Sequence, residues 1–250
     1  MQVLNAPMNH PLHSATKPQA IRPGVVAETW LDYCQGWFDA NTAYITQDGG
    51  ALVSNWANRA PPDGVTRDLS QSTAAQQPLW VDAVINGYPV VRFDGAATNP
   101  DNLKNTVYPI PGWPVHYYFV GQSISTQTYA TIIEPASARG TTELHTNYNG
   151  NLWAMSNINT NIAKSGNGVP VVVHAAFIPG ACQLRVNGSL SAKVNLDLGT
   201  ATGIMLGALY GPANGANWDI AELIILYGNF PDAVNSALMS WLANKYAITI

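Results

Sequence analysis

The stretch Trp218-Asp219-Ile220-Ala221-Glu222-Leu223-Ile224-Ile225-Leu226-Tyr227 decides the fold, because it is apolar on both faces of an extended strand. Successive side chains of a strand point to opposite faces. The alternation predicts two apolar sets, Ile220, Ile224 and Leu226 on one face and Ala221, Leu223, Ile225 and Tyr227 on the other. Such a strand must be covered on both sides.

The segment after this strand predicts a single helix over about residues 232–245. Its apolar residues follow helical i, i+4, i+7, i+8 spacing at Val234, Leu238, Trp241 and Leu242. Pro231 is placed for the first turn, and Asp232 lies near the positive end of the helix dipole. We expect Leu238 and Trp241 to pack on the strand that carries Leu223 and Ile225, because the helix has one apolar stripe and that strand has two apolar faces.

The rest of the chain predicts a meander of short antiparallel strands. Residues rich in β-formers lie at 88–93, 115–120, 142–147, 151–155, 169–178, 182–186 and 189–194. Turn dipeptides separate several of them, at Asn149-Gly150, Pro179-Gly180 and Asn187-Gly188. Residues 101–113 and 210–217 are interpreted as loops. This pattern is typical of an all-β sandwich or jelly roll.

Residues 1–24 are expected to form an extended N-terminal arm, followed by one domain over residues 25–250. The arm has prolines at 7, 11, 18 and 23 and no sustained apolar period. It cannot build a core of its own, so its order must come from contacts with a neighbouring subunit. The apolar anchors for that contact are Val3, Leu4, Leu12 and Ile21.

Composition excludes several function classes. The hydrophobic fraction is 47%, charged residues make up 10%, and the net charge is -4 without a basic cluster, which argues against a nucleic-acid partner. No apolar run approaches the about 20 residues that span a bilayer, and no signal peptide is visible. We therefore expect synthesis in a host cytoplasm. For Cys34 and Cys182 the sequence leaves a disulfide open and favours two free thiols.

Several motifs, in order, resemble the concanavalin-A-like lectin/glucanase superfamily, in particular laminin-G-like jelly-roll modules of phage structural proteins. The motifs are Trp37-Phe38-Asp39-Ala40, residues 53–59 (VSNWANR), Gln77-Pro78, residues 89–95 (PVVRFDG), Asp219-Ile220-Ala221-Glu222 and residues 242–246 (LANKY). Asn58 stands where the family commonly has an acidic residue. The resemblance implies an antiparallel concanavalin-A-like jelly roll over about residues 30–246.

Catalytic patterns of this superfamily are not found in the sequence. Its glycosidases carry two carboxylates on one strand, but this chain has no acidic pair at i, i+2 spacing. Glu28 and Asp32 precede the sandwich, and Asp219 and Glu222 are expected on opposite faces of their strand. There is also no Gly-x-Ser-x-Gly motif. We therefore expect a chain that is not an enzyme and has no catalytic residues.

No cofactor or metal site is predicted either. His116, His145 and His174 lie in separate predicted strands and His10 and His13 in the arm, without zinc-ligand spacing. Asp94, Asp101 and Asp219 could supply oxygen ligands to calcium, but single aspartates at strand ends are more often turn formers. Glu222 is expected to pair with Arg92, because a covered carboxylate needs a partner.

Two function classes remain for the sequence. The motifs, the arm and the low charge favour a structural component of a phage particle, such as a capsid decoration, head fibre or tail protein. Its partners would be other virion subunits, and it would be a homo-oligomer. The alternative is a module that binds host-surface glycans through exposed aromatic and amide groups on end loops, at Asn147, Tyr148 and Asn149 and at Tyr210, Asn214 and Asn217. Polysaccharide hydrolysis ranks third.

Overall fold

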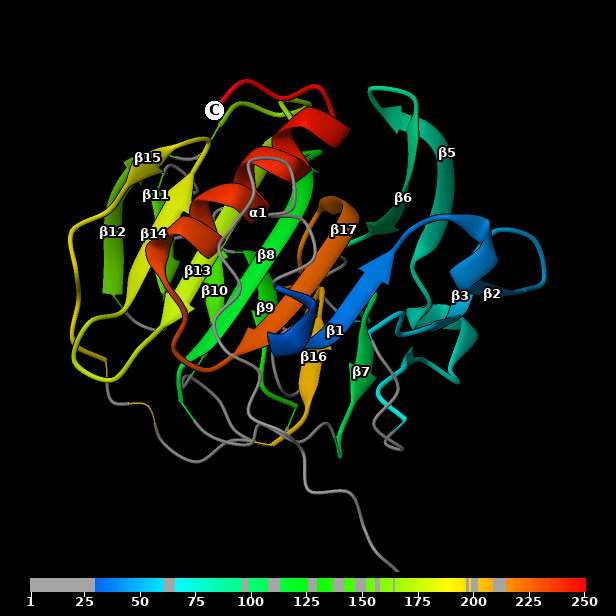
Figure 1. The fold of residues 1–250 in the computed structure, drawn as a ribbon. Coiled ribbons are helices and arrows are strands. Elements are labelled where there is room, and N and C mark those ends of the chain that lie inside the picture. Colours follow the sequence, from blue (N-terminus) through cyan, green and yellow to red (C-terminus); the bar gives the residue numbers. More distant parts are fainter. Residues whose placement is uncertain are drawn as a thin grey trace, which may run out of the picture.

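The computed structural model describes residues 30–60, 66–95, 99–107, 113–125, 130–136, 142–146, 152–155, 158–163, 165–196, 198, 202–208 and 215–250. These residues form an antiparallel all-β sandwich with a C-terminal helix, as the sequence predicts (Figure 1). Seventeen strands are joined by hydrogen bonds into one continuous sheet that folds into two layers. The predicted arm lies outside the described residues.

The first layer packs against the helix. It consists of β1 (Cys34–Asp39), β5 (Leu79–Ile85), β6 (Tyr88–Phe93), β8 (Val115–Ser123), β13 (Val171–Phe177), β14 (Gln183–Val186), β15 (Ser189–Leu190) and β17 (Trp218–Tyr227). β17 lies between β8 on one side and β1 and β6, end to end, on the other. Beyond β8 follow β13, β14 and β15.

The second layer lies behind the first in Figure 1. It consists of β2 (Ile45–Asp48), β3 (Leu52–Trp56), β4 (Leu69–Ser70), β7 (Leu103–Asn105), β9 (Ala130–Glu134), β10 (Leu144–Thr146), β11 (Leu152–Met155), β12 (Ile158–Ala163) and β16 (Ile204–Leu206). The pairing of Leu52 with Leu79 joins the two layers through β3 and β5. Short 3-10 helices occur at Leu31–Tyr33, Thr42–Tyr44 and Ala74–Gln76.

β17 has two apolar faces, as predicted, but a β-bulge changes which residues share a face. Its register against β8 shifts between Ile220 and Glu222. Ile220 therefore joins Leu223 and Ile225 in the core between the two layers. Ala221 joins Ile224 and Leu226 in a second core under the helix. The strict alternation predicted for Ile220 and Ala221 is wrong, because a bulge inserts one residue into the period of two.

Helix α1 (Asp232–Lys245) has the predicted bounds and covers the outer face of the first layer (Figure 1). Leu238, Met239 and Leu242 are buried in the same cluster as Ile224 and Leu226. The helix therefore packs on the strand that carries Leu223 and Ile225, as predicted, and it does so on the face of Ile224 and Leu226, since Leu223 and Ile225 face the other layer.

Trp241 lies at the edge of this contact rather than in its centre. Its side chain is partly buried, and its ring centroid is 6.0 Å from that of Trp30 and 6.2 Å from that of Trp37. The buried stripe of α1 is rotated toward Met239 and Ala243, so Trp241 lies at the margin of the contact between the helix and the sheet.

Most of the predicted strands are present. β6 has the predicted bounds, and β14 and β15 are joined at Asn187 and Gly188, whose φ angles of 43° and 80° fit a two-residue hairpin turn. β10 and β11 pair antiparallel, while the Asn149-Gly150 turn lies outside the described residues. Residues 101–113, interpreted as a loop, contain β7, whose pairing with β4 and β16 is not visible in so short an apolar pattern.

Both cysteines are free and buried. Cys34 lies in the core under the helix, and Cys182 lies in the core between the layers. Burial raises the pKa of the Cys34 thiol to about 12. Among the helices in the described part of the chain, none has the length and apolar character needed to cross a membrane.

Candidate functional site

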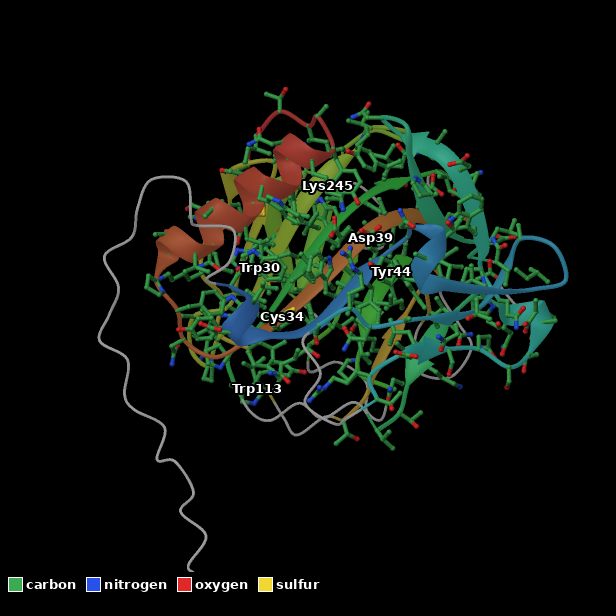
Figure 2. All side chains as sticks on the ribbon, turned by 45° about the vertical axis from the view of Figure 1, so that its right-hand side comes forward. Trp30, Cys34, Asp39, Tyr44, Trp113 and Lys245 are labelled. Carbon is green, nitrogen blue, oxygen red and sulfur yellow. The ribbon has the colours of Figure 1, made fainter. Side chains whose placement is uncertain are left out.

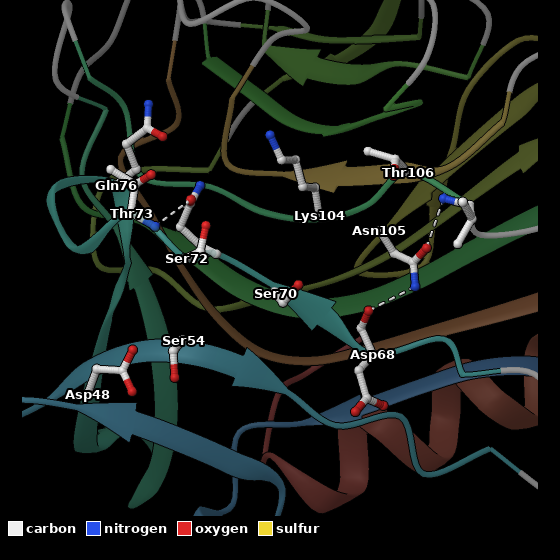
Figure 3. Close-up of a pocket in the computed structure, with 12 residues that line it drawn as sticks. Asp48, Ser54, Asp68, Ser70, Ser72, Thr73, Gln76, Lys104, Asn105 and Thr106 are labelled. Carbon is white, nitrogen blue, oxygen red and sulfur yellow. Dashed lines mark hydrogen bonds between the residues drawn. The ribbon is translucent and has the colours of Figure 1, made fainter.

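A polar groove of about 650 Å³ lies on the outer side of β2, β3, β4 and β7 (Figure 3). Only one of its lining residues, Val107, has an apolar side chain. The groove is lined by Asp48, Ser54, Asp68, Ser70, Gln71, Ser72, Thr73, Gln76, Lys104, Asn105, Thr106 and Val107. We call it the β4 groove.

Strand alternation turns these side chains outward. Leu69 of β4 and Leu103 of β7 are fully buried in the core between the layers. Their neighbours Ser70 and Lys104 therefore point to the outer face. Ser70 and Lys104 are also direct partners in the β4–β7 pair, so both side chains leave neighbouring positions on this face.

Hydrogen bonds hold the two carboxylates of the β4 groove. Asp68 Oδ1 accepts from the backbone N–H of Asn58 at 2.9 Å, and Asp68 Oδ2 accepts from Asn55 Nδ2 at 3.3 Å. Asp48 Oδ2 accepts from Gln77 Nε2 at 3.0 Å. Each carboxylate retains free lone pairs for a ligand, because an ionised carboxylate can accept about four hydrogen bonds.

The amides of the β4 groove are oriented in the same way. Asn105 Nδ2 donates to the backbone carbonyl of Asp68 at 3.0 Å, and Gln71 Nε2 donates to Asn102 Oδ1 at 2.6 Å (Figure 3 shows the first bond). By contrast, the side chains of Ser70, Ser72 and Lys104 have no hydrogen-bond partner in the described part of the protein. The groove therefore combines fixed acceptors with free donors, which suits a ligand rich in hydroxyl groups.

A second polar cluster connects α1 to the first layer. Glu222 is fully buried, and it accepts from Trp37 Nε1 at 2.6 Å and from Lys245 Nζ at 2.9 Å. Lys245 Nζ also donates to Asp39 Oδ2 at 3.2 Å, which Arg59 contacts at 2.6 Å. Figure 2 shows Lys245, Asp39 and Tyr44 on this side of the molecule. Burial raises the pKa of Glu222, while Lys245 opposes that shift.

Arg92 pairs with Asp219 and not with Glu222, so the predicted Arg92–Glu222 pair is wrong. Arg92 Nε and Nη2 donate to the two oxygens of Asp219 at 2.7 and 3.0 Å, and Gln122 Nε2 donates to the same carboxylate at 3.0 Å. The register explains the pairing, because Asp219 lies directly opposite Arg92 in the β6–β17 pair. The partners of Asp219 and Glu222 give both carboxylates a structural role.

The prediction that Asp219 and Glu222 lie on opposite faces is also wrong. Trp218 and Ile220 face the core between the layers, so Asp219 between them lies on the helix side. Glu222 lies on the same side, since it contacts Lys245 of α1. The bulge after Ile220 gives the i, i+3 pair a common face.

Two of the three strand histidines form a pair that the sequence does not reveal. His116 of β8 and His174 of β13 are buried, and His116 Nδ1 lies 3.0 Å from His174 Nε2. Burial lowers the pKa of His116 to about 4 and the pKa of His174 well below its usual value. His145 Nδ1 contacts Glu143 Oε1 at 2.7 Å.

Within the described ranges, no group of three or more His, Cys, Asp or Glu side chains is arranged to hold a metal ion. Asp94 and Asp101, considered for calcium, are joined by a bond from the Asp94 N–H to Asp101 Oδ2 at 2.7 Å. Burial raises the pKa of Asp101 to about 6. This contact closes a loop, as expected for aspartates at strand ends.

Of the residues predicted to bind glycans, Asn217 is the one that the structure describes. Its Oδ1 accepts from the Gly95 N–H at 3.0 Å, and its Nδ2 donates to Ser125 Oγ at 2.8 Å, so it connects three loops. Outside the described residues lie Asn147, Tyr148, Asn149, Tyr210 and Asn214, together with the arm anchors Val3, Leu4, Leu12 and Ile21. The β4 groove was not predicted from the sequence.

Comparisons with known proteins show likeness in the fold. Neither a protein-family model nor a curated protein matches this sequence. Among solved structures, a Trypanosoma rangeli sialidase in complex with sialic acid has a TM-score of 0.54 at 10% identity, covering 88% of this chain and 34% of its own. An arabinofuranosidase complexed with arabinofuranosyl-alpha-1,2-xylobiose has a TM-score of 0.56 at 12% identity, covering 76% of this chain and 50% of its own.

A structure described as a receptor binding domain has a TM-score of 0.52 at 12% identity, covering 87% of this chain and 53% of its own. The chain thus spans between 34% and 53% of the length of these three structures. At such identities the likeness shows the fold alone. That fold is compatible with the concanavalin-A-like sandwich that the motifs imply.

The expectation that the chain is not an enzyme is contradicted by these comparisons, because sialidases and an arabinofuranosidase are among the structures with this fold. Spacing along one strand cannot detect carboxylates that lie on different segments, and the fold brings Asp48 of β2 and Asp68, which precedes β4, to the same groove. We therefore withdraw that expectation.

Proposed function

We propose that this protein binds carbohydrate in the β4 groove. The observation that carries the proposal is the set of free donors at Ser70, Ser72 and Lys104 beside the hydrogen-bonded carboxylates of Asp48 and Asp68. Vicinal hydroxyl groups of a sugar both donate and accept hydrogen bonds. A ring that donates to the carboxylates can accept from the serines and the lysine at the same time.

The charge of the β4 groove favours a neutral glycan. Two aspartates and one lysine line it, so its side chains carry one net negative charge when all three are ionised. An acidic sugar would meet like charge at both aspartates. A neutral hexose or pentose gains the same hydrogen bonds without that repulsion.

The volume and lining of the β4 groove support a short segment of a glycan chain rather than a deeply enclosed ligand. Its volume of about 650 Å³ falls within the usual range for ligand sites, but its lining has no aromatic ring on which a pyranose could stack. We therefore expect affinity from several hydrogen bonds. The sialidase in complex with sialic acid and the arabinofuranosidase in complex with arabinofuranosyl-alpha-1,2-xylobiose show that proteins with a similar fold include ones that bind sugars.

The test is a glycan array followed by titration calorimetry with the best neutral oligosaccharide. Ser70→Trp fills the groove from the exposed side of β4, and Lys104→Gln removes its cation. Both variants should weaken binding by about tenfold or more, because each removes at least one hydrogen bond to the ligand. Lys193→Gln, a lysine outside the groove, serves as the matched control and should bind like the parent protein.

Binding of neutral glycans that is unchanged in both groove variants would refute the β4 groove as the site. The end loops around Tyr148 and Tyr210 would then be examined next. Release of reducing sugar by the parent protein, lost in Asp48→Asn or Asp68→Asn, would show that the groove cleaves its glycan as well as binding it. A retained turnover in both aspartate variants would place any hydrolysis elsewhere.

We also propose, on the sequence motifs and the proline-rich segment alone, that the protein functions within a phage particle. Its partners would then be other virion subunits, and it would be made in the host cytoplasm. Deletion of residues 1–22 should leave the melting temperature of the free domain almost unchanged but abolish its incorporation into particles. Incorporation at the parental level would contradict this proposal.

A further inference from the structure

A second cavity, of about 300 Å³, lies between the first layer and the beginning of α1. Its lining residues come from β8, β13, β14, β15, the adjoining turns and the first turn of the helix. The apolar wall of the cavity is formed by Ala176, Ile178, Ala181 and Leu190, and the polar wall by His116, His174, Gln183, Arg185, Lys193, Asp232 and Asn235. Leu184 also borders the cavity, but its side chain lies in the core between the layers. We call it the α1 cavity.

Arg185 has a donor without an acceptor at this cavity. Its Nη1 donates to Ser236 Oγ at 3.3 Å, and its Nη2 lies 3.8 Å from Asp232 Oδ1. Its Nε is buried and has no hydrogen-bond partner in the described part of the chain. A buried donor without a partner costs about 1–3 kcal/mol, so such groups are normally satisfied by water, an ion or a ligand.

The charges around the α1 cavity are not balanced. Arg185 and Lys193 are cationic, and Asp232 is the carboxylate in the lining. The side chain of Asp232 is 77% exposed, so solvent weakens its attraction for Arg185. His116 and His174 remain neutral at pH 7, because burial holds the pKa of both below the usual range. The lining thus carries one net positive charge near a buried donor.

The polar wall is held in place by hydrogen bonds that do not involve a ligand. His116 and His174 bond to each other, and Asn235 Oδ1 accepts from the buried Tyr118 hydroxyl. Asn235 Nδ2 donates to Asp232 Oδ1 at 3.2 Å. The Tyr118 ring stacks on His174 with centroids 4.3 Å apart. A ligand would therefore enter a preorganised site.

We propose that the α1 cavity binds a small organic carboxylate with a short aliphatic body. The carboxylate is attracted by the Arg185 guanidinium and by Lys193, and the aliphatic part packs on Ala176, Ile178 and Leu190. An anion is required because the net charge of the lining is positive, and an apolar body is required because one wall has no donors. The volume, at the lower end of the range for ligand sites, limits the ligand to a few carbon atoms.

The proposal is tested on the full chain by calorimetry and by amide chemical shifts, with butyrate as the probe. Butyramide has the same shape without the charge, and inorganic phosphate has charge without the apolar body. Butyrate should bind, with affinity at least about tenfold above that of either comparison compound, because it alone matches both walls. The shifted amides should belong to β13, β14 and the first turn of α1.

Two kinds of variant separate the site from a general effect on folding. Arg185→Gln and Lys193→Gln should each weaken butyrate binding, the first by about tenfold or more. Ala181→Leu should block binding by filling the cavity while all charges remain. Lys104→Gln, in the β4 groove, is the matched control and should bind butyrate like the parent protein.

Lys193 is exposed, so its replacement should leave the melting temperature unchanged and gives a readout even if Arg185→Gln unfolds. The proposal is overturned if butyrate does not bind, or if it binds equally to the parent protein, Lys193→Gln and Ala181→Leu. Tighter binding of phosphate than of butyrate would also overturn it, because the site would then recognise charge alone.

Discussion

Replacing Lys245 with methionine tests the role of the buried Glu222 cluster. The change keeps the aliphatic stem and removes the ammonium group that lies 2.9 Å from Glu222 Oε2. Glu222 is fully buried and Lys245 is 21% exposed, so the pair is largely shielded from water. Removing one partner of such a pair typically costs about 3–5 kcal/mol.

The structure favours the lower end of that range. Glu222 retains its bond from Trp37 Nε1 at 2.6 Å, and Asp39 retains Arg59 at 2.6 Å. We therefore expect Lys245→Met to lower the free energy of unfolding at pH 8 by about 3 kcal/mol, a large share of the 5–15 kcal/mol of an ordinary domain. Urea unfolding followed by tryptophan fluorescence measures this difference.

The same variant predicts a dependence on pH. Burial raises the pKa of Glu222 and Lys245 opposes the rise, so the pKa in the folded variant should be higher still. An acid whose pKa is raised on folding penalises the folded state while it is ionised, and the penalty is relieved as pH falls through the folded pKa. The loss of stability should therefore be smaller at pH 5 than at pH 8.

A double variant with Glu222→Gln removes the carboxylate as well and should recover part of the loss at pH 8, without the pH dependence. A loss below about 1 kcal/mol at pH 8, or an equal loss at both pH values, would refute the reasoning that the buried carboxylate depends on Lys245.

Three further predictions concern other contacts. The buried pair His116 and His174 has lowered pKa values, so stability should fall as pH drops from about 6.5 toward 4, by more than about 1.4 kcal/mol, and a His174→Gln variant should lose less over this range in acid titrations of unfolding. Trp241→Ala should cost about 2 kcal/mol in thermal unfolding, below the range for a fully buried tryptophan, because its ring is partly exposed; a cost above about 4 kcal/mol would contradict this. Asp219→Asn should cost about 2 kcal/mol in urea unfolding, since it weakens both bonds from Arg92; an unchanged midpoint would show that the pair adds nothing.

The sequence predicts the two covered faces of β17 because eight of its ten residues are apolar and they fall on both faces of the strand. It does not predict the bulge after Ile220, because that irregularity depends on where β1, β6 and β8 pair with this strand. For the same reason, the sequence alone does not reveal that Arg92 pairs with Asp219. The register of β6 and β17 places these two residues directly opposite each other.

The β4 groove was missed because its elements are too short to show a period. β4 has two residues and β7 has three, so alternation around Ser70 and Lys104 gives no signal along the sequence. The lining is also assembled from segments between positions 48 and 107, whose proximity follows from strand pairing. A hydroxyl-rich run at Ser70, Ser72 and Thr73 is the sequence signal that could have indicated it.

The central position of β17 determines the order in which this protein can fold. β1, β6 and β8 are all made before β17, yet each forms hydrogen bonds to it. While the chain is being synthesised, these three strands have open edges and an uncovered apolar face, the features that lead to aggregation. The sandwich can close only after residue 227 has emerged, so a nascent chain shorter than this should depend on chaperones to remain free of aggregates.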